Sequence, residues 1–441
     1  MRKKGGEVFS GPGRMYSVVN DTGMLHTASP FYSMTDMPKV CSEAGRGLVY
    51  FQVTVQEESG VEHKTGIEDC YVIKNNKKLR MGYTTGSCAA GAAKAAAYML
   101  LNGREIGTVS LVTPKGIELS LKLLDIHRED GYVSCAVRKD GGDDPDATNG
   151  ILVYARVEKT SEPGILIDGG EGVGRVTKPG LEQPVGSAAI NRVPRLMIRQ
   201  GVEEICEAAG YTGGISVVIS IPEGASVAQK TFNPRLGIVG GISVLGTSGI
   251  VEPMSEAALI RSIQVEMNML TADGARYLLI TPGNYGQAFV REQMHLDLEK
   301  AMKCSNFVGE TIDMAVESGV KGILFVAHIG KFIKVAGGIM NTHSRCADSR
   351  AELMTAFALR AGATLEQAKE ILDTLTTEEA VALLEQYGLK EAVMPLIVER
   401  IIYYLDHRAY GRLELGLVLF SNEHGLLGMT ENAREMIGKL L

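Results

Sequence analysis

The chain has 441 residues, and its 45 basic against 52 acidic side chains give a net charge of −7. The length favours two or three domains, and a hydrophobic content of 45% excludes a chain that is disordered throughout. The acidic balance argues against a nucleic-acid partner, since such proteins usually carry a basic surface. No apolar run approaches the roughly 20 residues that cross a bilayer, so no membrane association is expected.

Residues 1–79 are polar, rich in Gly, Ser and Lys, and weakly periodic. We expect an N-terminal extension that is poorly ordered, with one alternating stretch at 48–56 as a strand. Its basic start lacks the apolar segment of a secretory signal. The seven cysteines are scattered and odd in number, which is typical of free thiols in a reducing cytoplasm.

Residues 80–225 are predicted to form an α+β domain with a largely antiparallel sheet. An Ala-rich helix is expected over 86–101, and a second helix over 193–209. Runs of strands separate them, which is the α+β pattern. The expected strands are 108–113, 117–126, 132–138, 151–157, 165–167 and 215–221.

Residues 226–441 are predicted to form a Rossmann-like α/β domain with a helical C-terminal part. Strands and helices alternate here, which favours a parallel sheet with crossover helices. The expected elements are helix 255–272, strand 277–281, helix 287–302, strand 306–308, helix 310–318, strand 322–328, helices within 347–408, strand 413–420 and helix 430–440.

The segment GYTTGSCAAGAAKAA (82–96) opens the first helix. The first N–H groups of a helix lack partners and attract carboxylates or phosphates. Thr84 and Thr85 are therefore candidate substrate contacts. The alternative is a capped structural helix with small residues for close packing.

An acidic turn, DGGDDPDATNG (140–150), brings several carboxylates together. Clustered carboxylates raise one another's pKa and can supply a general base. We take Asp143 and Asp144 as candidate catalytic residues. A hard-cation site and a solvated turn are the alternatives.

The segment ILIDGGEGVGRVTKPG (165–180) imitates the glycine motif of Rossmann methyltransferases. That motif needs a helix after the glycines, and the Lys178-Pro179-Gly180 sequence would cut such a helix short. We expect a substrate-facing loop in which Arg175 and Lys178 offer cations to carboxylates.

A strand, a Gly-rich loop and a helix are predicted over 277–289, an arrangement that binds ligands outside the carboxyl end of a strand. The candidate cofactor residues of this loop are Gly283, Asn284, Tyr285 and Gly286. The loop after the next long strand, with His328, Lys331 and Lys334, would form the second rim of the same crevice. Farther along, His343 lies three residues before Cys346 with no further obvious ligands, so no protein metal site is expected.

Several segments together resemble the CbiD family, the cobalt-precorrin-5B (C-1)-methyltransferases. The resemblance runs from about Lys78 to the C-terminus. It rests on GYTTGSCAAGAAKAA, DDPDATNG, GGEGVGRVTKPGL, INRVPRLMI, TFNPRLGIVGGISVLGTSGIVEPMSEAAL, PGNYG, SNFVGETIDMA and HIGKFIKVAGGIMNTHSRCADSR, in this order.

The resemblance implies methyl transfer from S-adenosyl-L-methionine to ring carbon C-1 of cobalt-precorrin-5B, giving cobalt-precorrin-6A in anaerobic cobalamin biosynthesis. A substrate with many carboxylates needs local cations. Candidate substrate contacts are Thr84, Thr85, Arg175, Lys178, Arg195, Arg235, His328, Lys331 and His343. Glu310 is a candidate carboxylate near the sulfonium, and His328 or His343 a candidate axial ligand of the substrate cobalt.

Two other functions are alternatives to methyl transfer. A non-catalytic corrinoid carrier would use the same basic rim without a cofactor pocket. A phosphotransferase is disfavoured because no P-loop sequence is present. The sequence leaves the oligomeric state open.

Overall fold

The computed structural model describes residues 63–283, 286, 289 and 301–440, and the backbone of two short strands nearer the N-terminus. The chain divides into two compact units, Met1–Tyr50 and Phe51–Leu441. In the first unit, β1 (Val18–Val19) pairs antiparallel with β2 (Leu25–His26). The predicted strand at 48–56 and most of the predicted extension lie outside the described residues.

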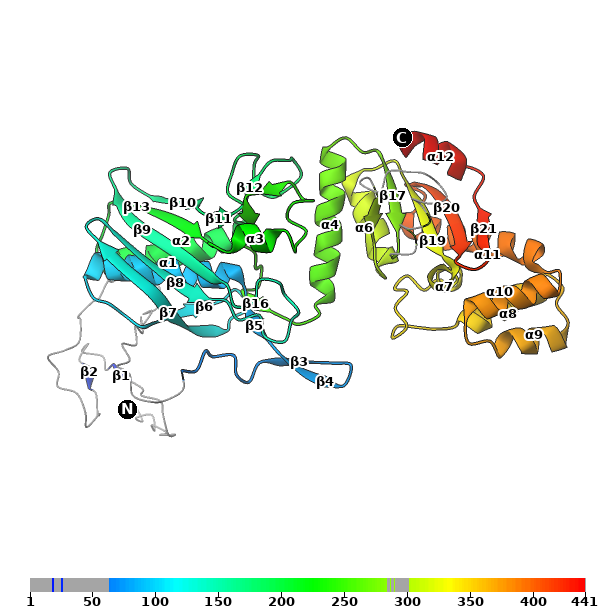
Figure 1. The fold of residues 1–441 in the computed structure, drawn as a ribbon, viewed down its shortest axis with the longest axis horizontal. Helices are drawn as coiled ribbons and strands as arrows, with labels where there is room; N and C mark the ends of the chain where they lie inside the picture. Colours follow the sequence, from blue (N-terminus) through cyan, green and yellow to red (C-terminus); the bar gives the residue numbers. More distant parts are fainter. Residues whose placement is uncertain are drawn as a thin grey trace, which may run out of the picture. The chain divides into compact units, whose positions relative to one another are not determined.

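A six-stranded sheet organises the first half of the second unit (Figure 1). Its order is β10-β13-β9-β8-β7-β6, and every neighbouring pair is antiparallel except β10 and β13. The strands are β6 (Thr108–Val112), β7 (Glu118–Glu129), β8 (Tyr132–Arg138), β9 (Leu152–Thr160), β10 (Ile165–Gly169) and β13 (Gly214–Ser220). The predicted strand runs of this region are thus confirmed.

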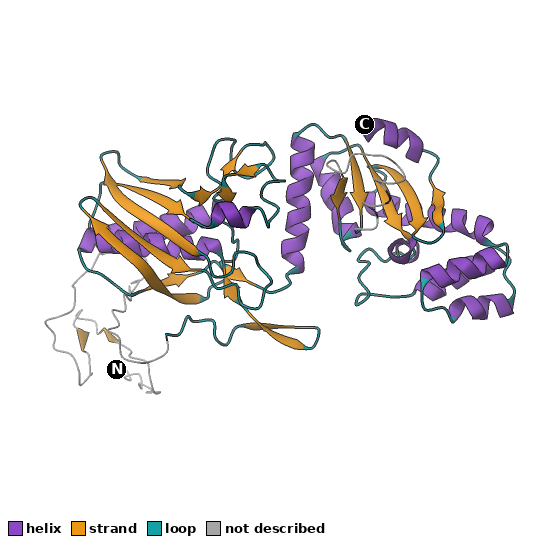
Figure 2. Cartoon of the chain, viewed as in Figure 1, coloured by secondary structure: helices purple, strands orange, loops and turns teal. Residues whose placement is uncertain are grey.

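Helices α1 (Thr85–Asn102) and α2 (Arg192–Ala208) pack against each other beside this sheet (Figure 2). Thr84 caps α1 by accepting a 3.2 Å hydrogen bond from the Ser87 N–H. Small residues let α1 approach the sheet closely, since a Cβ on Gly91 would lie 2.5 Å from Leu121 Cδ1. Helix α1 is therefore the centre of the first hydrophobic core.

Residues 63–79 differ from the poorly ordered extension that the sequence suggested. They include the hairpin of β3 (Tyr71–Lys74) and β4 (Lys77–Arg80). Ile67 is fully buried in the first core, and the Ser120 N–H donates to the Thr65 carbonyl. The buried Ile67 side chain and the hydrogen bond to β7 attach this polar segment to the first core.

Short strand pairs bind a Gly-rich segment, residues 231–251, to the first core. These pairs are β11 (Gly172–Val173) with β15 (Gly241–Ile242), β12 (Arg175–Val176) with β14 (Ile238–Val239), and β5 (Gly82–Tyr83) with β16 (Ile250–Val251). A short helix, α3 (Gly224–Ala228), precedes the segment. The expected boundary at 225 therefore falls inside this packed region.

A five-stranded sheet organises the second half. Its order is β18-β17-β19-β20-β21, parallel except for the antiparallel edge strand β21. The strands are β17 (Tyr277–Thr281), β18 (Ala301–Lys303), β19 (Gly322–His328), β20 (Glu414–Ser421) and β21 (Gly425–Met429). The largely buried strands β17, β19 and β20 match the predicted crossover pattern.

Helices accompany this sheet, and most of them contribute to a second hydrophobic core. Those in this core are α4 (Glu256–Ala272), α6 (Val308–Ser318), α7 (Ile329–Phe332), η2 (Val335–Gly337), α8 (Arg350–Arg360), α9 (Leu365–Leu372), α10 (Thr377–Gln386) and α11 (Lys390–Ala409). The last helix, α12 (Ala433–Leu440), packs instead in a separate cluster with residues of β17, β19 and β20. Among the described residues, no helix combines the length and apolar character that a bilayer crossing requires.

One predicted strand near residue 300 is wrong, because residues 306–308 form no strand. The predicted helix 287–302 lies mostly outside the described residues, and its last two residues belong instead to the strand at 301–303. The Phe307 N–H donates to the Cys304 carbonyl in a turn, and Ser305 has a positive φ of 54°. This turn leads directly into α6.

Candidate active site

The carboxyl ends of β17, β18 and β19 meet at one edge of the five-stranded sheet, because these strands are parallel. After β17 the chain passes to β18 on one side, and after β18 it crosses to β19 on the other. The connection after β17 and the connection into β19 therefore run to opposite sides, and the point where they part lies between β17 and β19. Open α/β sheets bind ligands at such a switch point.

Lys331 connects the segments that follow these strands. Its ammonium donates to the Pro282 carbonyl at 3.0 Å and to Asn306 Oδ1 at 2.9 Å. Pro282 follows β17, Asn306 follows β18, and Lys331 lies in α7 after β19. Burial lowers the pKa of this amine. Lys331 therefore places a partly buried cation at the switch point.

The two described glycines of the loop after β17 have different surroundings. Among the described residues, a Cβ on Gly283 would meet only Lys331 Nζ, at 3.7 Å, so these residues leave space beside the cation. A Cβ on Gly286 would lie 2.8 Å from the Val326 carbonyl oxygen and 2.9 Å from Thr281 Cβ. The chain at Gly286 therefore lies directly against β17 and β19.

Two of the predicted cofactor residues, Asn284 and Tyr285, lie outside the described residues. The remaining predicted cofactor residue, Glu310, is in the first turn of α6. Its charge, after the stronger effect of Asp313, raises the pKa of Arg408 on α11. Its Oε2 is buried and has no hydrogen-bond partner among the described residues. Glu310 thus retains a buried oxygen for a cation, on the side of α6 near Arg408.

Residues 341–348 reach the same edge. The Thr342 N–H donates to the Asn306 carbonyl at 3.0 Å, which places His343 beside the segment after β18. Buried Lys334 holds this loop by donating to the carbonyls of Thr342 at 3.3 Å and Ala347 at 2.8 Å. His343 Nδ1 accepts from the Arg345 N–H at 3.1 Å. The structure therefore brings His343 and Lys331 to one region.

His328 ends β19 and caps α7, and both of its ring nitrogens are engaged. Nδ1 accepts from the Gly330 N–H at 3.0 Å, and Nε2 lies 3.0 Å from Glu378 Oε1. Burial lowers the pKa of His328, although the Glu378 carboxylate opposes this effect. Axial coordination of cobalt by His328 would need one of these two contacts to break.

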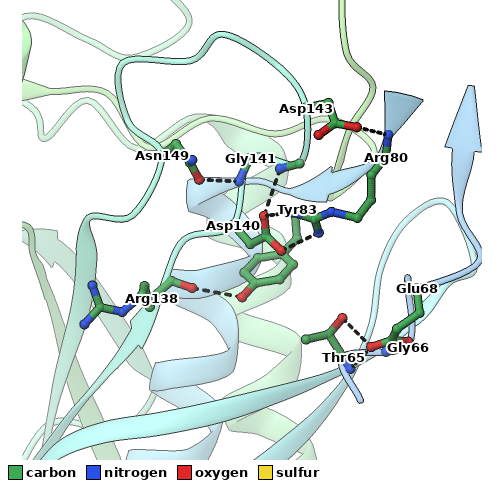
Figure 3. Close-up of polar contacts among 11 residues, drawn as sticks. Thr65, Gly66, Glu68, Arg80, Tyr83, Arg138, Asp140, Gly141, Asp143 and Asn149 are labelled. Atoms are coloured by element: carbon green, nitrogen blue, oxygen red, sulfur yellow. Dashed lines mark hydrogen bonds and ion pairs between the residues drawn. The ribbon is translucent and has the colours of Figure 1, made fainter. Parts of the chain in front are cut away.

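The acidic turn is tied to its neighbours at both aspartates. Asp143 is exposed, and it accepts a 2.6 Å hydrogen bond from the Arg80 N–H (Figure 3). Asp144 accepts a 2.9 Å hydrogen bond from the Met254 N–H. The candidate catalytic carboxylates therefore also hold the turn against β4 and the end of the Gly-rich segment.

A bidentate ion pair supports the start of this turn (Figure 3). Arg80 donates to both carboxylate oxygens of Asp140, at 2.6 and 2.8 Å. This contact lowers the pKa of Asp140. Tyr83 donates from its hydroxyl to the Arg138 carbonyl at 2.9 Å and from its N–H to the Asp140 carbonyl at 2.8 Å. Arg80 and Tyr83 thus attach the turn to the entrance of α1.

The start of α1 is covered by the Gly-rich segment. The Gly86 N–H donates to the Leu245 carbonyl at 2.8 Å, and Thr85 Oγ1 accepts from the Leu245 N–H at 2.9 Å. Thr84 and Thr85 are both buried. The helix N–H groups that were expected to meet an anion are therefore engaged with protein atoms, and both threonines have structural partners.

The predicted cations differ in how free they are. Arg175 forms a bidentate pair with Asp168 at 2.7 and 2.9 Å. Arg195 donates to the backbone carbonyls of Ile190 at 2.9 Å, Ile167 at 2.8 Å and Ala188 at 3.2 Å. Lys178 and Arg235 are exposed. The glycines at 170–174 include the short strand β11 and are followed by β12 and not by a helix, which confirms that this segment only imitates a Rossmann motif.

Comparison with known proteins decides the family. The CbiD family pattern matches residues 72–253, and the pattern of the CbiD C-terminal domain matches residues 341–431. A relative from Ruminiclostridium cellulolyticum is 52% identical over 352 residues, which are 80% of this chain and 91% of that protein. The chain belongs to the CbiD family.

CbiD relatives carry an enzyme name. The Ruminiclostridium protein is named cobalt-precorrin-5B C(1)-methyltransferase, as is a protein from Thermoanaerobacter sp. that is 46% identical and covers 81% of this chain and 97% of its own length. A crystal structure of a cobalamin biosynthesis protein (cbiD) from Archaeoglobus fulgidus is 29% identical, covers 63% of this chain and 86% of that chain, and has a TM-score of 0.34.

Several residues of this CbiD chain that shape the candidate site were not found from the sequence. Asn306 organises the switch-point edge, and Arg80 and Asp140 organise the acidic turn. Asn306 lies in the predicted strand 306–308, shortly before the predicted helix 310–318, where a polar residue can also indicate a turn. Arg80 and Asp140 gave no signal, because these two partners are distant from each other in sequence.

Proposed function

We propose that the chain is a cobalt-precorrin-5B C(1)-methyltransferase that uses S-adenosyl-L-methionine. The observation that carries this proposal is the similarity to relatives of that name, which extends over 91% of the Ruminiclostridium protein and 97% of the Thermoanaerobacter protein. Methyltransferase chemistry implies this methyl donor. The switch-point edge supplies a place for it.

The proposal includes two domains. The α+β domain is built on the six-stranded sheet, and we move its limit from the predicted residue 225 to the end of β16 at Val251. The second domain, from α4 to α12, is Rossmann-like, because four parallel strands run in the order β18-β17-β19-β20, with α6 between β18 and β19 and with α7 to α11 between β19 and β20. Separate hydrophobic cores support this division.

We place the methyl donor against the loop after β17, at Gly283, Asn284, Tyr285 and Gly286, with Glu310 as a further cofactor residue. Open space beside Gly283 lets an anionic group approach the Lys331 ammonium. A carboxylate is such a group, and charge-assisted hydrogen bonds bind it well. The amide of Asn306 fixes the position of Lys331 and so of that carboxylate.

The proposed substrate contacts are the cations and polar groups predicted from the sequence. Lys178 and Arg235 are exposed and free to meet carboxylates of a tetrapyrrole. The other predicted contacts have partners within the protein, so we propose that they also hold the surrounding loops in position. These residues are Arg175, Arg195, Thr84 and Thr85. Lys331, His343 and His328 lie on segments that converge on the switch-point edge.

The reaction places few covalent demands on the protein. A bound donor would supply a sulfonium methyl group: the ring carbon would give the electron pair of the new carbon–carbon bond, and the electron pair of the broken carbon–sulfur bond would stay on sulfur. Holding the two reactants at near-attack distance can supply most of the acceleration. Asp143, exposed beside Arg80, and Asp144 are our proposed sources of a general base for a proton that the macrocycle releases.

Binding of the methyl donor separates this function from a corrinoid carrier. Gly283→Asp would place a carboxylate beside Lys331 and compete with the donor, whereas Gly283→Ala adds only a methyl group in open space. We expect donor affinity, measured by calorimetry, to fall at least about tenfold in the first variant and to stay unchanged in the second. Corrinoid binding without donor binding in the unaltered protein would favour a carrier.

The proposal also includes a cytoplasmic location. The six described cysteines are all free thiols, in agreement with a reducing compartment. No nucleic-acid or membrane partner is part of the proposal, because the net charge is −7.

A further inference from the structure

We propose that Glu378, Glu423 and His424 form a binding site for a divalent transition-metal ion of the Zn²⁺ class. The three side chains come from α10 and from the turn between β20 and β21. One ligand atom of each lies within 4.8 Å of the other two. The site is independent of the proposed transferase activity.

The spacing of the three residues fits a metal ion. Zn–N and Zn–O bonds are about 2.0–2.2 Å, so two ligand atoms of a tetrahedral ion lie about 3.4 Å apart. Glu378 and His424 are mostly buried, whereas Glu423 is exposed. The exposed Glu423 side chain can therefore rotate to bring its carboxylate to the distance that an ion requires.

The histidine is oriented as metal-binding histidines are. His424 Nδ1 lies 3.1 Å from Glu385 Oε2, near the end of α10. A carboxylate partner at Nδ1 fixes the tautomer in which Nε2 carries the free electron pair. His424 Nε2 is buried, and no hydrogen-bond partner for it lies among the described residues. An unpaired buried nitrogen next to two carboxylates is a metal-ligand arrangement.

The supporting contacts hold the ligands in place. Ser421, at the end of β20, donates from its hydroxyl to Glu378 Oε2, and the N–H groups of Glu423 and His424 donate to Ser421 Oγ at 3.1 and 2.9 Å. His328 Nε2 lies 3.0 Å from Glu378 Oε1. Both carboxylate oxygens of Glu378 and the backbone of the turn are thus held in position before any ion binds.

The donor set indicates the class of ion. Imidazole nitrogen suits Zn²⁺ and its neighbours in the first transition row, while an all-oxygen site would favour Mg²⁺ or Ca²⁺. One imidazole and two carboxylates leave a fourth position for water. The bound ion would join α10 to the β20–β21 turn, next to His328, which contacts Glu378 at the carboxyl end of β19.

The test is Zn²⁺ affinity of the full chain, measured by competition with a chromophoric chelator, in a Cys346→Ser background that removes an exposed thiol. We expect one ion per chain. His424→Ala should lower the affinity at least about 100-fold, and Glu385→Gln, which leaves all three ligands intact, by about 10–100-fold.

Two matched controls accompany these variants. Lys390→Met removes the 2.7 Å ion pair of Glu385 but keeps its contact with His424, and should change the affinity by about twofold or less. His127→Ala removes an exposed histidine on β7 and should change nothing. Equal affinity in the parent and in both His424→Ala and Glu385→Gln would overturn the proposal. Sulfur among the ligands in the zinc X-ray absorption spectrum would overturn it as well.

Discussion

Lys331 Nζ donates a 2.9 Å hydrogen bond to Asn306 Oδ1, and so joins the segments that follow β19 and β18. The Asn306 carbonyl accepts from the Thr342 N–H, which attaches the loop of His343 to the same place. Three segments that are distant in sequence therefore meet at one residue, Asn306, through its side-chain amide oxygen and its backbone carbonyl. This connection defines the edge where we place the methyl donor.

Replacing the cation tests this placement. Lys331→Met keeps the length of the side chain but removes its charge and its hydrogen bonds to Pro282 and Asn306. Charge-assisted hydrogen bonds contribute about 1.5–3 kcal/mol each, so the KM for the donor should rise at least about tenfold. Steady-state kinetics with varied donor concentration measures this effect.

Lys321→Met is the matched control, because Lys321 is exposed and lies just before β19, at the opposite end of the strand. Its donor KM should equal that of the unaltered protein. A similar rise in both variants would contradict the assignment of the donor to the carboxyl edge.

Close packing at the entrance of α1 predicts a large loss of stability in Gly246→Ala. The new Cβ would lie 2.1 Å from Thr84 Oγ1, and Gly246 has a φ of 136°. Overpacking and backbone strain together should lower the free energy of unfolding by about 2–4 kcal/mol, as measured by urea denaturation. Gly103→Ala, at a φ of 67° with no atom within 4 Å of the new Cβ, should cost only about 1 kcal/mol. Equal losses would show that the Thr84 contact is not tight.

The Arg80–Asp140 pair predicts a pH dependence of stability. The hydrogen bonds from Arg80 lower the pKa of Asp140 below its ordinary value of 3.8, so the folded state binds fewer protons at this group. Its stabilising contribution is present above the unfolded-state pKa and is lost as the pH falls through the folded-state pKa.

Asp140→Asn should therefore cost about 1 kcal/mol at pH 7, since both partners are partly exposed and screened. The difference from the unaltered protein should shrink below about pH 4. Urea denaturation between pH 7 and pH 3 measures it, with exposed Asp130→Asn as the control. A difference that stays constant over this range would refute the role of the ion pair.

The acidic turn is tested by substitutions that keep its shape. Asn at position 143 can still accept the Arg80 N–H through its amide oxygen, but it cannot take a proton. If Asp143 is the general base, Asp143→Asn should lower kcat by about 100-fold or more with little change in stability. Asp144→Asn, which keeps an acceptor for the Met254 N–H, separates the roles of the two carboxylates. Full activity in both variants would show that neither carboxylate is the general base and that the turn has only a structural role.

Local patterns predicted the elements that depend on neighbouring residues. The capping threonine at 84 and the run of small residues predicted α1, and alternation of apolar residues predicted β7. The alternation of strands and helices predicted the parallel strands β17, β19 and β20. In each case the pattern is set by short-range geometry.

Features that depend on distant partners could not be predicted in this way. Thr85 is bound by Leu245, which is 160 residues away, so an apparently open helix terminus is closed. The Gly-rich segment pairs with β5, β11 and β12 of the first half, although the sequence pattern assigned it to the α/β domain. His328 is engaged by Glu378 from α10. Such contacts decide which predicted site residues are free to bind a ligand.

The central claim is methyl transfer, and one measurement tests it most directly. The full chain is incubated under anaerobic conditions with cobalt-precorrin-5B and S-adenosyl-L-methionine carrying a deuterated methyl group, and the corrinoid is analysed by mass spectrometry. The account predicts one added labelled methyl group, located on C-1 by fragmentation and absent without the protein. An unchanged corrinoid mass, with folded protein and both reactants bound, would contradict it.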